Sequence, residues 1–333
     1  MRQRRYLGVD AGGTSTRCAL IDGRGLVLAR GAAGAANHHT TEPAAVRASV
    51  RASIRTALGA HDHDDATATP GERGCVEAVG IGWSGLEVPG CEADARAIVG
   101  DSVDAKVMVL DSDVVAAHLG AFMGEPGVLV AAGTGSIVLG VDAAGKRVRV
   151  GGWGHRFGDE GSAAWIATEG IRAALHGADG RGPRTALWQA LLEHAGLAAG
   201  PSASFRATAH AVTAWLYHPA RHLNDVATFA PRLHAAAIAG DAVAAAVLHR
   251  AGVELARQVA AAVQRLEPQA YVAVAGTGGV WEHAAAVREG CRQALAEFLP
   301  GVGVRWAPAT VDPAVGAAFM AMLADGHALP GSD

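Results

Sequence analysis

The chain has 333 residues, of which half are hydrophobic, and its formal net charge is −4 at pH 7 with a pI near 6.4. This length suggests two domains, and the lack of a basic stripe or a high pI argues against nucleic-acid binding. Since no apolar segment approaches membrane-spanning length and no export signal opens the chain, we expect a soluble, cytoplasmic protein that contacts neither nucleic acid nor membrane.

The first predicted feature is a phosphate-binding turn in residues 8–16, Gly-Val-Asp-Ala-Gly-Gly-Thr-Ser-Thr. A buried strand over 6–9 ends at Asp10, and two glycines and three hydroxyl residues follow. Glycine lets backbone N–H groups approach a ligand, a turn of such groups cradles phosphate oxygens, and the carboxylate can hold a hydrated Mg²⁺. A second strand over 17–23 follows. The turn therefore lies in a β-hairpin, whereas the Walker and dinucleotide motifs precede a helix.

Strands and helices alternate through the rest of the first half. The pattern predicts, in order, strand 25–30, a helix from Pro43, a polar loop 61–74, strand 76–81, helix 92–99, strand 106–110 and helix 114–123. The polar residues Asp10, Ser84 and Asp113 follow the ends of three of the strands. Because ligands bind outside the carboxyl ends of strands in open α/β sheets, we expect a ligand site there.

After a break at 125–127 the opening pattern repeats. A strand over 128–132 is followed by a Gly/hydroxyl turn over 133–136 and by strands over 137–141 and 147–150. Such internal repetition indicates a duplicated fold. We therefore predict two related α/β domains that face each other across a cleft, the first spanning residues 1–115 and the second residues 116–333.

The remainder of the chain carries two further glycine-rich segments. The predicted order is a loop over 151–162 with two acids, a helix over 163–175, an Ala-rich helical region over 185–266, strand 271–275, a glycine loop over 276–280, a helix to about Leu299, strand 302–306 and a last helix over 313–325. Asp312 and Pro313 open that helix, since proline favours the first turn. The tail from Gly326 is expected to fray.

With these motifs the chain resembles the sugar-kinase/heat-shock/actin ATPase superfamily, and within it the BadF/BadG/BcrA/BcrD-type group that includes N-acetylglucosamine kinase. The matching stretches are 8–16, 83–85, 112–114, 132–136, 151–162 and 275–279. The most specific is 151–162, Gly-Gly-Trp-Gly-His-Arg-Phe-Gly-Asp-Glu-Gly-Ser. The resemblance implies two duplicated ribonuclease H-like (actin-like ATPase) domains. It also implies ATP-dependent phosphorylation of an amino sugar, with N-acetylglucosamine at its 6-hydroxyl ahead of glucosamine, N-acetylmuramate and N-acetylmannosamine.

The resemblance also implies residue roles. Asp113 would be the general base, although Asp111 competes by chemistry alone, and Asp10 would hold Mg²⁺ through water. The residues implied for the phosphates of ATP are Gly12, Gly13, Thr14, Ser15, Gly133, Thr134 and Gly135. Those implied for adenosine are Gly276, Gly278 and Gly279, and those implied for the sugar are Asn37, Ser84, Gly85, Thr134 and Asp159. Trp153 and His155 either line the sugar site or pack beneath their loop. A homodimer is expected.

Three alternatives remain open. A repressor-type glucokinase would carry a clustered Cys/His zinc site, and an activator ATPase of a dehydratase or reductase would need paired cysteines for a shared iron–sulfur cluster. The cysteines of this chain are scattered, at Cys18, Cys75, Cys91 and Cys291. They match no such spacing and are expected to be free thiols. A non-catalytic sensor would tolerate loss of the acids, yet Asp10 and Asp113 are both present.

Overall fold

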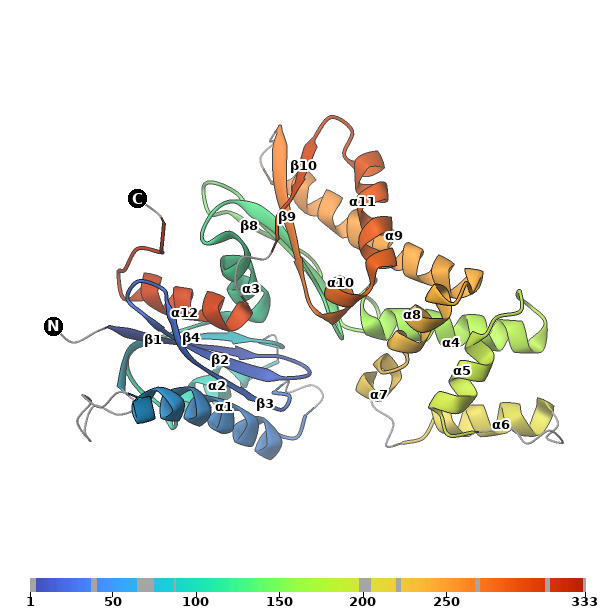
Figure 1. The fold of residues 1–333 in the computed structure, drawn as a ribbon, viewed down its shortest axis with the longest axis horizontal. Helices are drawn as coiled ribbons and strands as arrows, with labels where there is room; N and C mark the ends of the chain where they lie inside the picture. Colours follow the sequence, from blue (N-terminus) through green and yellow to red (C-terminus); the bar gives the residue numbers. More distant parts are fainter. Residues whose placement is uncertain are drawn as a thin grey trace.

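The computed structural model describes residues 4–36, 41–64, 75–86, 88–197, 205–219, 223–266, 270–308 and 312–331. These residues form two five-stranded sheets, with strand orders β3-β2-β1-β4-β5 and β8-β7-β6-β9-β10 (Figure 1). The first sheet and its neighbours comprise β1 (Arg5–Ala11), β2 (Thr16–Asp22), β3 (Val27–Ala33), α1 (Pro43–Asp64), β4 (Cys75–Trp83), α2 (Cys91–Gly100), β5 (Asp104–Ser112) and α3 (Asp113–Phe122). The second comprises β6 (Gly127–Ala132), β7 (Ser136–Val141), β8 (Arg147–Gly151), β9 (Tyr271–Thr277) and β10 (Gly303–Trp306).

The two sheets have the same topology. In each, the central strand, β1 or β6, pairs antiparallel with the next strand of its hairpin and parallel with β4 or β9. Hairpins produce the antiparallel pairs, and helical crossovers produce the parallel ones. The predicted duplication of an α/β fold is therefore confirmed.

The last helix, α12 (Pro313–Ala324), crosses back to the first sheet. Figure 1 shows it in red on one face of the blue strands, with α1 and α2 on the other. Its backbone touches the strands directly, because a Cβ atom on Gly8 would lie 1.9 Å from the Ala314 carbonyl oxygen and one on Gly80 would lie 1.8 Å from that of Ala317. The predicted division at 115/116 places this helix in the second domain, whereas its packing belongs to the first.

Helix α3 links the two sheets. Its side chains Val114, Ala117 and Phe122 form one cluster with apolar residues of β6, β7 and β9. Its opposite side meets α12, where a Cβ atom on Gly316 would lie 1.9 Å from the Ala116 carbonyl oxygen. The crossing of α3 and α12 therefore joins the two halves of the molecule.

The second sheet is covered by helices and carries a helical extension at the right of Figure 1. The helices are α4 (Ala163–Asp179), α5 (Leu187–His194), α6 (Phe205–Leu216), α7 (Leu223–Ala227), α8 (Ala230–Ile238), α9 (Ala242–Arg265), α10 (Gly279–His283) and α11 (Ala285–Phe298). In the described part of the chain no single helix is long and apolar enough to cross a membrane. One pair, 225–238 with 242–265, meets the length and composition criteria together but is bent by 119°.

Three local predictions are wrong. Helix α1 continues through residues 61–64, which were predicted as loop, because extending an existing helix costs far less than starting one. The helix predicted to run to Leu299 is broken at Ala284, and the Arg288 guanidinium donates to the carbonyl groups of Trp281 and Glu282 at the break. The tail is packed rather than frayed as far as it is described, since Leu329 is buried beside the first sheet.

The close contact between α12 and β4 gives a stability prediction. Gly80→Ala should lower the free energy of unfolding by at least about 3 kcal/mol, because the new methyl group would meet backbone that cannot move without shifting the helix. The measurement is urea unfolding. The matched control is Gly59→Ala in α1, where a Cβ atom meets nothing within 4 Å and where helix propensity predicts a gain of about 0.5–1 kcal/mol. Equal effects of the two changes would contradict the packing argument.

Candidate active site

The carboxyl ends of the central strands bring the predicted acids to one edge of the first sheet. Asp10 of β1 is in register with Gly82 of β4, and Trp83 of β4 is in register with Ser112 of β5. Asp113 follows Ser112 directly and begins α3. A Cβ atom on Gly82 would lie 3.3 Å from the Asp113 Cα, so the start of α3 lies against the end of β4.

Asp10 is the most buried acid of this edge, with 5% of its surface exposed. Burial raises the pKa of its carboxyl group to about 7, against the opposing effect of Arg17, whose guanidinium lies 3.3 Å from the carboxylate. The negative charges of Asp113 and Asp312 raise this pKa further. Asp312 was predicted only as a helix cap. It accepts from Val315 N at 3.0 Å and also pairs with Arg30 of β3.

The donor set at this edge fits a hydrated cation. The site gathers carboxylates, which are the oxygen ligands that Mg²⁺ takes while keeping several of its waters. In the described ranges no group of three acid, histidine or cysteine side chains is close enough to hold an ion directly. The expected role of Asp10, which is to hold Mg²⁺ through water, stays a prediction.

The two acids that compete for the role of base have different surroundings. Asp111 Oδ2 accepts from the Arg147 guanidinium at 2.6 Å, and its Oδ1 accepts from Ser112 N at 2.8 Å. Arg147 belongs to β8, so this ion pair bridges the two sheets. Asp113 accepts from Val114 N at 2.8 Å and contributes to the field at Asp10. Asp111 is thus engaged in an ion pair between the halves of the molecule, while Asp113 lies at the acidic edge.

The second Gly/hydroxyl turn, residues 133–135, lies at the carboxyl end of β6. Its carbonyl groups accept from the first N–H groups of α4, at 2.9 Å for Gly133 with Ala163 and 3.2 Å for Thr134 with Ala164. The loop that follows β9 lies against this turn. Gly278 has a φ of +95°, and a Cβ atom there would lie 2.6 Å from the Ala132 carbonyl oxygen. The predicted phosphate and adenosine segments of this domain are therefore neighbours.

The loop over 151–162 is folded onto the same turn through Asp159. This residue has a left-handed backbone, with a φ of 57°, and 9% of its surface is exposed. Its Oδ1 accepts from Gly154 N at 3.2 Å, and a Cβ atom on Gly135 would lie 2.8 Å from its Oδ2. Burial raises the pKa of Asp159, whereas hydrogen bonds from the Gly154 and Ser136 backbone lower it. The predicted sugar loop and phosphate turn are thus in contact.

The other predicted sugar residues lie in different surroundings. Ser84 Oγ is buried and has no hydrogen-bond partner within the described ranges. Gly85 follows it with a φ of 79°. Trp153 is 80% exposed, so the alternative that it packs beneath its loop is wrong. Asn37 lies outside the described residues.

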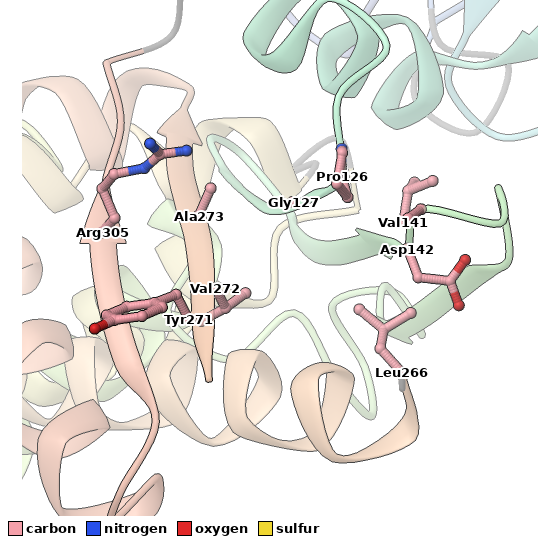
Figure 2. A pocket seen from close by; sticks show the side chains of 10 residues that line it. Pro126, Gly127, Val141, Asp142, Leu266, Tyr271, Val272, Ala273 and Arg305 are labelled. Carbon is pink, nitrogen blue, oxygen red and sulfur yellow. The ribbon is translucent and has the colours of Figure 1, made fainter. Parts of the chain in front are cut away.

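A hollow of about 410 Å³ lies elsewhere, at the opposite end of the second sheet. Figure 2 shows Tyr271 and Arg305 on neighbouring strands at one side of it and Val141 with Leu266 at the other. Gly127 and Tyr271 begin the strands that end near the phosphate and adenosine segments. This hollow is therefore separate from the site.

Comparison with known proteins gives a consistent result. A model of the BadF/BadG/BcrA/BcrD ATPase family matches residues 7–321. The N-acetyl-D-glucosamine kinase of Dictyostelium discoideum is 25% identical over 330 residues, 97% of this chain and 99% of that protein. The glucosamine kinase GspK of Vibrio cholerae serotype O1 is 28% identical over 78% of each chain. The crystal structure of a candidate N-acetylglucosamine kinase from Chromobacterium violaceum gives a TM-score of 0.73 at 28% identity, covering 95% of this chain and 98% of that one.

A pH prediction follows from His118, on the helix that carries Asp113. Burial lowers the pKa of His118 below 6.5. The hydrogen bond of its Nε2 with the Gly127 carbonyl oxygen, at 3.0 Å, opposes this shift, and the nearby charge of Arg147 adds to it. The unfolded chain therefore binds this proton more readily, and the free energy of unfolding should fall as the pH drops below about 6.5. His118→Gln should reduce this loss between about pH 7.5 and about pH 5.5, measured by urea unfolding. The exposed His249→Gln is the control. If both variants keep the wild-type slope, His118 does not titrate as argued.

Proposed function

The chain belongs to the BadF/BadG/BcrA/BcrD ATPase family and is an ATP-dependent sugar kinase with two duplicated actin-like ATPase domains, and from this premise we propose that it phosphorylates N-acetylglucosamine at the 6-hydroxyl. The observation that carries the proposal is the contact of Asp159 with the turn over 133–135. It places the segment expected to bind sugar beside the segment expected to bind phosphate. Likeness along nearly the whole chain to N-acetylglucosamine kinases supports the same substrate.

The nucleotide would be held by both domains. Residues 12–15 and 133–135 would contact its phosphates, and Gly276, Gly278 and Gly279 its adenosine. Asp10 would hold Mg²⁺ through water. When bound, the metal neutralises the negative charge that builds on the phosphoryl oxygens. Because the transition state of phosphoryl transfer is loose, the protein contributes chiefly positioning and electrostatics.

Asp113 would orient the sugar 6-hydroxyl and accept its proton as that oxygen attacks. Its place at the start of α3, beside the end of β4, puts the carboxylate at the edge where Asp10 lies. Ser84, Gly85, Thr134 and Asp159, together with Asn37, would hold the sugar. The reaction would take place in the cytoplasm.

The cysteines argue against an activator ATPase. Cys18, Cys91 and Cys291 are buried, and none of the four cysteines, all within the described residues, forms a disulfide. An iron–sulfur cluster shared between two subunits would need cysteines in pairs at a surface. Free glucosamine and N-acetylmuramate are the alternative substrates, and the glucosamine kinase relative has a similar likeness over most of the chain.

The assignment of the base is tested by a matched pair of variants. Asp113→Asn should lower kcat by about 10²- to 10⁴-fold, because the amide cannot take the proton, while sugar binding measured by calorimetry is retained. Asp111→Asn is the control and should keep turnover within a few-fold, since its carboxylate holds Arg147. The reverse outcome would transfer the role of base to Asp111.

The substrate is tested by ADP release with glucose, glucosamine, N-acetylglucosamine, N-acetylmannosamine and N-acetylmuramate. We expect N-acetylglucosamine to give the highest kcat/KM. A preference for glucosamine would keep the mechanism and overturn the assignment of the sugar 2-substituent. The absence of stimulation by any of the sugars would contradict the proposed reaction.

A further inference from the structure

Helix α9 forms the support on which the loop over 151–162 rests. A Cβ atom on Gly161 would lie 2.5 Å from the Leu255 side chain and 2.8 Å from the Ala251 carbonyl oxygen, and one on Gly151 would lie 2.3 Å from Gln258 Oε1. The three helix residues are spaced four and three apart, so they share one face of α9. Both ends of the loop therefore touch a single stripe of this helix.

Gln258 is the polar member of that stripe and is buried, with 8% of its surface exposed. Its Nε2 donates to the Glu160 carbonyl oxygen at 3.1 Å, while its Oε1 has no partner among the described residues. Ser136 Oγ donates to the same carbonyl oxygen at 2.8 Å. A buried amide with one unmatched end is costly to keep, so its presence in an apolar stripe calls for a role.

The carbonyl that Gln258 holds belongs to the residue directly after Asp159. Asp159 has a left-handed backbone, which is strained for a side chain other than glycine. Two donors fixed on the Glu160 carbonyl set the orientation of the adjoining backbone. The Asp159 carboxylate itself accepts from Gly154 N and lies against the turn over 133–135.

We propose that Gln258 is a positioning residue for the sugar, acting through the Glu160 carbonyl to hold the Asp159 carboxylate in place. It touches neither substrate nor nucleotide. This inference rests on the proposed function, in which Asp159 contacts the sugar. It assigns to a helix outside the glycine-rich motifs an indirect influence on sugar affinity.

The test is steady-state kinetics on Gln258→Met, which keeps the length of the side chain and removes its donor. The sugar KM, measured with N-acetylglucosamine or with the best sugar of the panel, should rise about 3- to 10-fold, the range for loss of one hydrogen bond. The ATP KM should change less than about 2-fold, because the adenosine segment keeps its contacts. The matched control is Gln264→Met, an exposed glutamine of the same helix, which should change neither constant.

Gln258→Glu supplies a readout that a purely structural role would not move. A glutamate at this position donates to the Glu160 carbonyl oxygen only when it is protonated, so its sugar KM should approach the wild-type value as the pH is lowered. This variant also serves if Gln258→Met does not fold. A sugar KM equal to wild type in Gln258→Met, or a Gln258→Glu defect that does not change with pH, would overturn the inference.

A separate variant distinguishes this failure from failure of the proposed function. Asp159→Asn should raise the sugar KM more than Gln258→Met does, since it alters the contacting group itself. If Asp159→Asn raises the sugar KM and the Gln258 variants do not, only the positioning role is lost. If Asp159→Asn leaves the sugar KM unchanged, the proposed sugar contact fails, and the inference fails with it.

Discussion

The backbone of α12 lies directly on β1 and β4, and the rest of the structure depends on this contact. It is possible because Gly8 and Gly80 have no side chains at the points where the helix passes. The same helix crosses α3 at Gly316, and α3 continues into the second sheet. One helix thus covers the first sheet, sets the position of the linking helix and brings Asp312 near Asp10. Moving α12 outward by the width of a methyl group would disturb all three.

The arrangement of charges around Asp10 does not stabilise the fold by itself and is better suited to holding a cation. A carboxylate as buried as Asp10 is costly in its charged form, which is why its pKa rises to about 7. Arg17 offsets this cost only in part, and the charges of Asp113 and Asp312 increase it. Protein interiors rarely keep a buried carboxylate near other negative charges unless that group takes part in binding or catalysis. A cation held near the phosphates of a nucleotide would supply the missing compensation.

Much of the fold could be predicted from the sequence, because strand and helix periodicity, glycine turns and the repeated motif order are local signals. The strands that end at Asp10, Ser84 and Asp113 and the duplicated hairpins are of this kind. The partner of α12 could not be predicted, because its nearly all-apolar sequence indicates burial without saying against which surface. The packed tail around Leu329 depends on the same long-range contact. The packing partner of α12 and the packing of the tail both follow from the arrangement of the two sheets in space.

The residues of the candidate site divide in the same way. Some are recognisable from local sequence motifs, and others reach the site only through contacts between distant parts of the chain. The glycine and acid motifs can be recognised from the sequence alone, and Arg17 directly follows one of them in the chain. The nearness of Asp312 to Asp10 and the contact of Gln258 with the Glu160 carbonyl join residues far apart in the chain, and no local pattern predicts such a contact. A glutamine within an apolar helical stripe is the one signal that could have drawn attention to α9.

The order of the chain has a consequence for synthesis on the ribosome. Strands β1 and β4 emerge early, whereas α12, which covers one of their faces, emerges after the whole second sheet. Domains usually fold as they leave the ribosome, but Tyr6, Ile21 and Ala78 on one face of this sheet pack against α12 and cannot be covered by it before that helix has been synthesised. A first sheet that formed before α12 was made would therefore expose this apolar face until the helix arrived.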